Sequence, residues 1–149
     1  MAYYFVQHGL ALSKDQDPAR RLSPEGESAV MRVATHLRQH NISLSGIFHS
    51  GKTRAHQTAL LFSQQLAVDN VSELTGMNPS DDVADFASAL QDNDNMYIGH
   101  LPHLERVVSY LITGNENAAV VKFTNAAVVC IKQVESEFYI DWVLSPAIC

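Results

Sequence analysis

The sequence predicts an α/β fold: a three-layer α/β/α sandwich with a mainly parallel sheet and a C-terminal antiparallel hairpin. Short apolar segments of strand length alternate with longer segments in which apolar residues recur at helical spacing. The last two apolar segments, 126–134 and 138–143, have no helix between them, as in a hairpin. With 149 residues, 46% apolar and 17% charged, the chain is expected to form a single domain, 1–149.

The N-terminal part is expected to form a strand, a loop and a helix. Residues 2–6 are apolar without alternation, as in a strand buried on both faces, and Gly9 permits a sharp exit from the sheet. A polar loop follows at 13–21. Ser23-Pro24 is typical of a helix start, with an N-cap followed by proline, and apolar residues at helical spacing predict a helix over 24–40.

The rest of the chain repeats this alternation. Gly51 turns the chain into a second helix with apolar residues on one face. Pro102 opens a later helix that Gly114 ends, because glycine readily adopts the left-handed conformation that closes a helix. Strands are expected at 46–49, 71–74, 96–99 and 118–123, and helices from 51, 79 and 102 onward.

Composition narrows the class of protein. The formal net charge of −6 argues against nucleic acid or an anionic membrane as a partner. The two cysteines, Cys130 and Cys149, form neither a disulfide framework nor a metal-binding pattern, and this usage suits a reducing cytosol. The N-terminus lacks the features of a signal peptide, and no segment has the length of a membrane span. A cytoplasmic protein is therefore expected.

Three strand-to-helix transitions end in residues that suit phosphate chemistry. These are His8, then Ser50 with Arg54, then His100. Ligands of an open α/β sheet bind at the carboxyl ends of its strands, so these residues are expected to meet around one crevice. Helix N-termini that arrive there offer free N–H groups, and an arginine adds a planar fork of donors. The sequence therefore predicts a local phosphate site in an acidic protein.

Four motifs, in order, cover nearly the whole chain. A Ser-x-x-x-Arg-Ala-x-Gln-Thr motif is intact at 50–58, and Gly-His-x-Pro is intact at 99–102. The place of Arg-His-Gly reads Gln-His-Gly at 7–9, and a stretch similar to Arg-Pro-Leu-Thr-x-x-Gly stands at 20–26. This set resembles the histidine phosphatase superfamily, which shares its fold with the phosphoglycerate mutases. Within it, the short SixA-type phosphohistidine phosphatases are the most similar branch.

The resemblance implies a role for each central residue. His8 is the nucleophile that forms a phosphohistidine intermediate, and a neutral imidazole suits this role near pH 7. Arg54 and His100 hold the phosphoryl oxygens, and Ser50 helps through its hydroxyl or as a helix cap. Positioning and charge stabilisation supply most of the catalysis of phosphoryl transfer, so no metal and no cofactor is expected. The implied substrate is a phosphohistidine-bearing signalling protein or a small phosphorylated molecule.

One departure from the motifs concerns Gln7, which stands where the family has a phosphate-binding arginine. Glutamine offers a neutral hydrogen bond to phosphate, and losing a charged contact costs on the order of 10- to 1,000-fold in rate. Arg20, which the motif register favours over Arg21, compensates if the loop folds over the site. A second hypothesis therefore stays open: a non-catalytic module that binds phosphate or phosphoproteins.

A second departure concerns the general acid. Larger family members carry an acidic insert, whereas the corresponding segment 67–82 is short and offers Glu73, Asp81 and Asp82. A phosphohistidine leaves as imidazole and needs less acid assistance than an alkoxide, so phosphoramidate or aryl phosphate substrates are favoured. A mutase is a third hypothesis, and the short chain without an acidic insert argues against it.

Simpler interpretations exist for several residues. His100 and His103 have the spacing of an H-x-x-H metal pair, although the intervening proline and the lack of nearby acidic ligands argue against zinc. Lys52 is expected to be solvated and turn chemistry explains Asn125, with contact to a ligand in the predicted crevice as the alternative for each. Surface exposure or helix packing explains four other histidines: His36, His40, His49 and His56.

Overall fold

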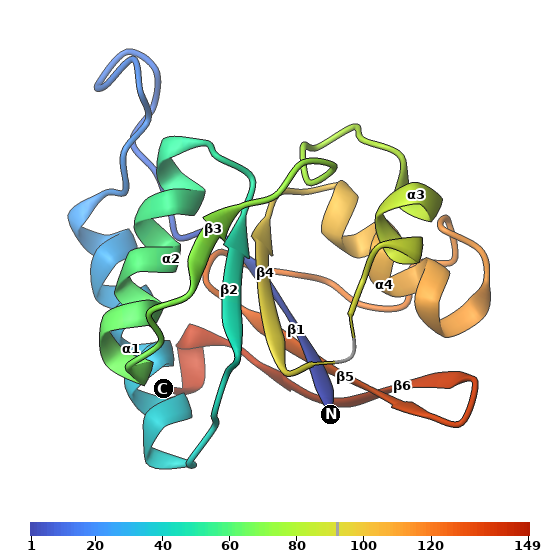
Figure 1. The fold of residues 1–149 in the computed structure, drawn as a ribbon. Helices are drawn as coiled ribbons and strands as arrows, with labels where there is room; N and C mark the ends of the chain where they lie inside the picture. The colour runs from blue at the N-terminus through green and yellow to red at the C-terminus, as the bar shows by residue number, and fades with distance from the viewer. Residues whose placement is uncertain (92) are drawn as a thin grey trace.

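The computed structural model describes residues 1–91 and 93–149 (Figure 1). Of the helices in these residues, none has the length and apolar character needed to cross a bilayer. In chain order the elements are β1 (Ala2–Gln7), α1 (Pro24–Gln39), β2 (Gly46–His49), α2 (Thr53–Leu66), β3 (Val71–Glu73), α3 (Val83–Ser88), β4 (Asn95–Gly99), α4 (His103–Thr113), β5 (Val128–Val134), β6 (Glu137–Leu144) and the short 3₁₀ helix η1 (Pro146–Ile148).

The strands form one six-stranded sheet in the order β3-β2-β4-β1-β5-β6. The first four strands of this order are parallel to one another, whereas β5 is antiparallel to both β1 and β6. Helices α1 and α2 cover one face of the sheet, and α3 and α4 cover the other (Figure 1). The predicted three-layer sandwich with a mainly parallel sheet and an antiparallel C-terminal hairpin is confirmed.

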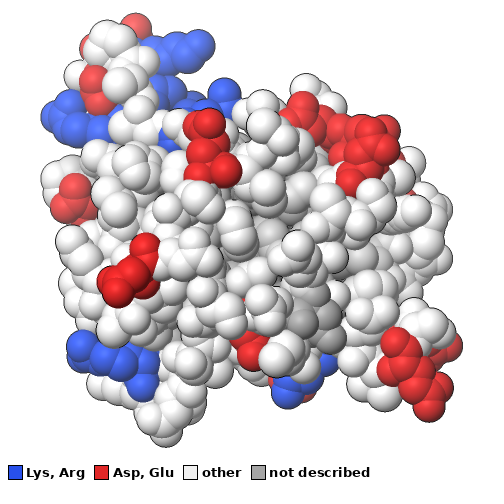
Figure 2. Space-filling model, in the orientation of Figure 1, with Lys and Arg blue, Asp and Glu red and all other residues white. Residues whose placement is uncertain are grey.

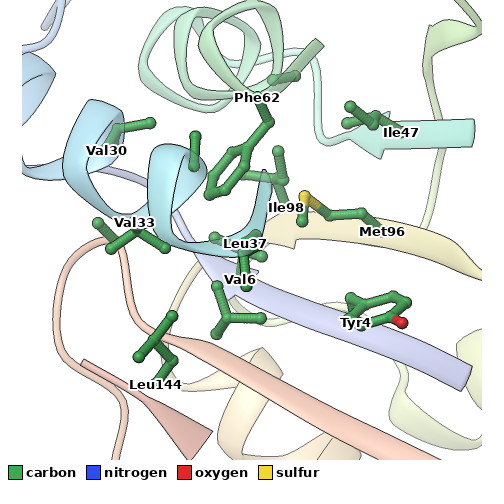
Figure 3. Packing of buried hydrophobic residues seen from close by; sticks show 14 of the residues in the cluster. Tyr4, Val6, Val30, Val33, Leu37, Ile47, Phe62, Met96, Ile98 and Leu144 are labelled. Atoms are coloured by element: carbon green, nitrogen blue, oxygen red, sulfur yellow. The ribbon is translucent and has the colours of Figure 1, made fainter. Parts of the chain in front are cut away.

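The central strand β1 explains why both faces are covered. Successive side chains of a strand point to opposite faces. Tyr4 and Val6 therefore enter the core under α1 and α2, whereas Tyr3 and Phe5 enter the core under α3 and α4. Figure 3 shows the first of these cores, where Phe62 of α2 packs toward the sheet. Because β1 is fixed from both sides, the residues that follow it are held in a defined place.

The helix ends follow the expected chemistry. The hydroxyl of Ser23 accepts a hydrogen bond from the backbone N–H of Gly26 at 3.0 Å, and Pro24 occupies the first turn of α1. Gly114 closes α4 with a φ of 79°, in the left-handed region. These caps confirm the predicted start of α1 and the predicted end of α4.

The prediction of a strand at 118–123 is wrong: these residues form an irregular segment beside α4. Side chains of α4 bind its backbone N–H groups. Glu105 Oε2 accepts from the N–H of Phe123 at 2.9 Å, and the hydroxyl of Ser109 accepts from the N–H of Val120 at 3.5 Å. The neighbouring places beside β1 are already taken by β4 and β5. The apolar composition of the segment therefore reflects packing and not strand pairing.

Candidate active site

The structure brings together the residues that end the central strands. His8 follows β1, His100 follows β4 and Ser50 follows β2, and these three parallel strands are neighbours in the sheet. His100 Nε2 and Ser50 Oγ lie 2.6 Å apart, and the ring centroids of His8 and His100 are 5.0 Å apart. Arg54, in the first turn of α2, donates from Nε to His8 Nε2 at 3.3 Å. These residues therefore lie together at this edge of the sheet, at the place that we call the crevice.

The hydrogen bonds of His8 define its protonation. Its Nδ1 lies 2.7 Å from the backbone carbonyl of Gly9, which can only accept, so Nδ1 carries the proton. Nε2 then holds the lone pair and accepts from Arg54. Burial lowers the pKa of His8 to about 4, against the bond to Gly9, and the charges of Arg54 and Arg20 lower it further. At neutral pH the ring is uncharged, with the lone pair of Nε2 directed at the guanidinium of Arg54.

Thr58 fixes the turn that carries His8. Its fully buried hydroxyl accepts from the backbone N–H of Gly9 at 3.0 Å and donates to the carbonyl of Arg54 at 2.8 Å. On the other side, Asn125 Nδ2 donates to the backbone carbonyl of His8 at 3.1 Å. Asn125 therefore contacts the turn through the backbone of His8. The sequence alone indicates no role for Thr58, although this residue is the last of the intact motif at 50–58.

The loop 13–21 places Arg20, and not Arg21, at the crevice. Arg20 Nε donates to the carbonyl of Leu12 at 3.1 Å. Burial and the positive charge of Arg20 together lower the pKa of Arg54, so the two guanidinium groups share one neighbourhood. Arg21 is exposed and forms an ion pair with Asp17 at 3.3 Å. This arrangement agrees with the register of the motif.

Two contacts hold the base of this loop. Gln57 Oε1 accepts from the backbone N–H of Leu22 at 2.7 Å, which ties the loop to α2. Gly26 allows α1 to approach the loop, because a Cβ at this position would lie 2.0 Å from the carbonyl oxygen of Leu10. The glycine of the 20–26 motif is thus explained by close backbone packing. Gln57, like Thr58, was missed as a positioning residue.

Gln7 brings no charge to the crevice. It ends β1 beside Gly99, and its Oε1 is buried without a hydrogen-bond partner among residues 1–91 and 93–149. A phosphoryl oxygen can accept a bond only from the amide nitrogen of this side chain. The edge of the sheet therefore presents a neutral donor where the family motif has arginine.

His100 contributes one donor and no charge at neutral pH. Burial, followed by the charges of its neighbours His8, Arg54 and Lys52, lowers its pKa to about 3. Its Nδ1 is buried with no partner in the part of the chain that the structure describes. The hydroxyl of Ser50, which contacts Nε2, also accepts weakly from the N–H of Lys52 at 3.4 Å. The N-cap position of α2 belongs to Lys52, so Ser50 lies ahead of the cap.

The three candidate acids have different surroundings. Glu73 packs over Gly51, where a Cβ would lie 1.7 Å from its Oε1 and where φ is 91°. Asp81 Oδ2 accepts from the N–H of Asn78 at 2.8 Å, and Asp82 caps α3. Glu73 is therefore the carboxylate placed directly against the start of α2, next to the crevice.

The remaining histidines have separate environments. His103 is fully buried and packs edge-on against Phe86, with ring centroids 5.1 Å apart. His49 stacks on His56 at 4.7 Å, and His49 Nδ1 accepts from the N–H of Gly51 at 3.1 Å. Within the described ranges, no cluster of three or more His, Cys, Asp or Glu residues has the arrangement of a metal site. These rings contribute to packing around the crevice.

Solved structures share this fold over almost the full chain. The protein histidine phosphatase SixA complexed with tungstate has a TM-score of 0.88 at 24% identity and covers 99% of both chains. The alpha-ribazole phosphatase from Shigella flexneri has a TM-score of 0.81 at 14% identity, with coverage of 98% of this chain and 97% of that chain. A phosphoserine phosphatase from Entamoeba histolytica, in complex with 3-phosphoglyceric acid, has a TM-score of 0.70 at 12% identity and covers 97% and 96%.

A scan against family models and a search of curated proteins found no match. The structural likeness and the four motifs nevertheless agree on one architecture. The chain has the fold of the histidine phosphatase superfamily, as its motifs predict.

Proposed function

We propose that the chain is a phosphatase that transfers a phosphoryl group from its substrate to His8 and then to water. The observation that supports this most directly is the state of His8. The ring is neutral, its proton is held at Nδ1 by the Gly9 carbonyl, and its Nε2 lone pair lies beside the Arg54 guanidinium. These are the properties that an imidazole nucleophile needs.

The reaction follows from the positions of these groups. His8 Nε2 attacks phosphorus, the bond from phosphorus to the leaving group breaks, and the leaving group departs with the electron pair and takes up a proton from solvent. Arg54 exchanges its contact with Nε2 for the phosphoryl oxygens and stabilises their charge, together with the N–H groups at the start of α2. Water then attacks phosphorus and loses a proton to solvent, the bond from phosphorus to Nε2 breaks, and phosphate leaves with His8 neutral again.

The substrate we propose is a phosphohistidine on a signalling protein of the cytoplasm, with a small phosphomonoester as the alternative. One structural neighbour is described as a protein histidine phosphatase, and its structure contains tungstate, a tetrahedral oxyanion like phosphate. The short 67–82 segment and the good leaving ability of imidazole support the same choice. Metal-independent chemistry is part of this proposal, because imidazole and guanidinium supply the nucleophile and the charge.

The test is turnover of a phosphohistidine peptide and of an aryl phosphate by the purified protein. We expect His8→Ala to abolish both activities and to remove the acid-labile phosphoenzyme that a radiolabelled substrate leaves on the wild type. His40→Ala is the matched control, since His40 is an exposed histidine at the end of α1. Turnover that survives His8→Ala would sink the proposed nucleophile.

Gln7 favours a second candidate function, a non-catalytic phosphate-binding module. The comparison of the wild type with Gln7→Arg separates the two functions. If the chain is a phosphatase, the wild type should turn over substrate. Gln7→Arg, which restores the charged donor, should then raise the turnover rate about tenfold. A binding module should bind phosphate without turnover until Gln7 is replaced.

A further inference from the structure

A second hollow adjoins the crevice. It has a volume of about 700 Å³ and shares Ser50 with the site described above. Apolar side chains of the β3–α3 segment and α3, among them Leu74 and Phe86, form its lining together with a set of carboxylates. Those carboxylates, which we call the acidic rim, belong to Glu73, Asp81, Asp82 and Asp85.

Glu73, the member of the acidic rim that ends β3, lies at the end of the strand row away from His8. The sheet order β3-β2-β4-β1 places Glu73, Ser50, His100 and His8 in that sequence along the edge. Adjacent strands are about 4.8 Å apart, so Glu73 and His8 stand at opposite ends of the site. Phosphoryl transfer runs in line, with the leaving group opposite the nucleophile. A phosphoryl group held by Ser50 and His100 therefore directs its leaving group toward the hollow.

The charge of the acidic rim is uncompensated. Asp81 and Asp82 each use a carboxylate oxygen to bind a backbone N–H, which fixes them without neutralising them. Among the ion pairs between described residues, none includes a member of the rim. Figure 2 shows acidic side chains gathered near α3 and basic side chains at the loop 13–21, on the other side of the molecule's upper edge. The site thus has a positive flank for phosphate, formed by Arg20 of the loop 13–21 and Arg54 at the start of α2. The acidic rim is its negative flank, for the group attached to the phosphate.

We infer that this hollow binds the leaving-group side of the substrate and selects a polypeptide with a lysine or arginine next to its phosphorylated residue. The inference rests on the proposed phosphatase function. The apolar lining suits the methylene stem of a basic side chain, while the rim binds its charged end. A hollow of this volume is in the range that holds a drug-sized group, so it accommodates side chains and not merely a single ammonium group.

The experiment compares two phosphohistidine peptides that differ only in having lysine or glutamate beside the phosphorylated residue. We expect kcat/KM to favour the lysine peptide by about tenfold at low ionic strength, with a smaller ratio at high salt, because the rim is open to solvent. Asp85→Asn should reduce the ratio and Asp85→Lys should reverse it. Glu27→Lys is the matched control, since Glu27 is likewise an acidic residue in the first turn of a helix.

The outcomes separate this inference from the proposed phosphatase function. Equal turnover of both peptides, with a ratio that Asp85→Lys does not move, overturns the inference and leaves the phosphatase proposal intact. If neither peptide is turned over, the phosphatase proposal fails, and calorimetry with stable phosphonate analogues of both peptides still measures the charge preference. Preference for phosphoethanolamine over the lysine peptide would overturn the choice of a polypeptide.

Discussion

The two flanks of the crevice are built in different ways. On the positive flank, side chains of α2 bind backbone groups that are distant in sequence: Thr58 reaches Gly9, 49 residues away, and Gln57 reaches Leu22, 35 residues away. On the negative flank, carboxylates bind backbone groups only three residues away, as Asp82 does with Asp85.

This difference separates two tasks. The positive flank is part of the frame that fixes His8, the proposed nucleophile, so changes there should reach His8. The carboxylates of the negative flank bind only the turn and the helix to which they belong, so a change in their charges should not move His8. We therefore assign the chemistry to the first flank and the choice of substrate to the second.

The largest effect should come from Arg54→Ala on the positive flank. Removing a charged donor to the transferred phosphoryl group costs about 100- to 1,000-fold in kcat/KM. Arg21→Ala serves as the control, because Arg21 pairs with Asp17 at the surface and should change kcat/KM by less than about threefold. Equal losses in both variants would show that the general charge of this flank matters and that the position of Arg54 does not.

The two buried histidines should make folding sensitive to acid. The pKa of His8 is lowered to about 4 and that of His100 to about 3, whereas an unfolded histidine titrates near 6.5. Below about pH 6.5 the unfolded chain therefore binds more protons than the folded chain. The free energy of unfolding is highest above this pH and falls as the pH drops toward 4, by about 3 kcal/mol for His8 alone. Denaturant unfolding at several pH values measures this loss, and His8→Asn should make it smaller. An unchanged pH dependence in His8→Asn would contradict the assignment.

A third effect tests whether the positive flank transmits changes to His8. Thr58→Val keeps the shape of the side chain but leaves the N–H of Gly9 without its acceptor, at a cost of about 2 kcal/mol of stability. We expect kcat to fall more than KM rises, and the imidazole resonances of His8 to shift. Thr35→Val on α1 makes the same substitution away from the crevice. If His8 responds alike in both variants, Thr58 has only a structural role.

The smallest effect should belong to the negative flank. Asp82→Ala removes the N-cap of α3 and should cost about 1 kcal/mol. Hydrogen exchange should show faster opening in α3, with the protection of Gly9 unchanged. Faster exchange at Gly9 would mean that the two flanks are coupled and that the division of tasks is incorrect.

The sequence was sufficient for the architecture and for the meeting of His8, Ser50, Arg54 and His100. Parallel strands align their carboxyl ends, so three strand-end motifs specify one location without any knowledge of distances. The register of the motif also favoured Arg20 over Arg21. The two side chains do differ, because Arg20 binds the carbonyl of Leu12 whereas Arg21 pairs with Asp17.

Other features depend on contacts that leave no local pattern. The segment 118–123 has the composition of a strand, yet its N–H groups are bound by side chains of α4. The contacts of Gln57 and Thr58 join distant segments and follow no periodicity. The hollow beside Ser50 is lined by the segment between β3 and α3 and by α3 itself, an arrangement that no motif encodes.

The hydroxyl of Thr58 has one further consequence. It bonds to the backbone of Gly9 and to the backbone of Arg54 at once, so a single atom joins the segment of the attacking nitrogen to the segment of the guanidinium. When thermal motion displaces α2 relative to the sheet, both groups should travel together. The distance between His8 Nε2 and the guanidinium of Arg54 should then stay constant while the other residues around the crevice move.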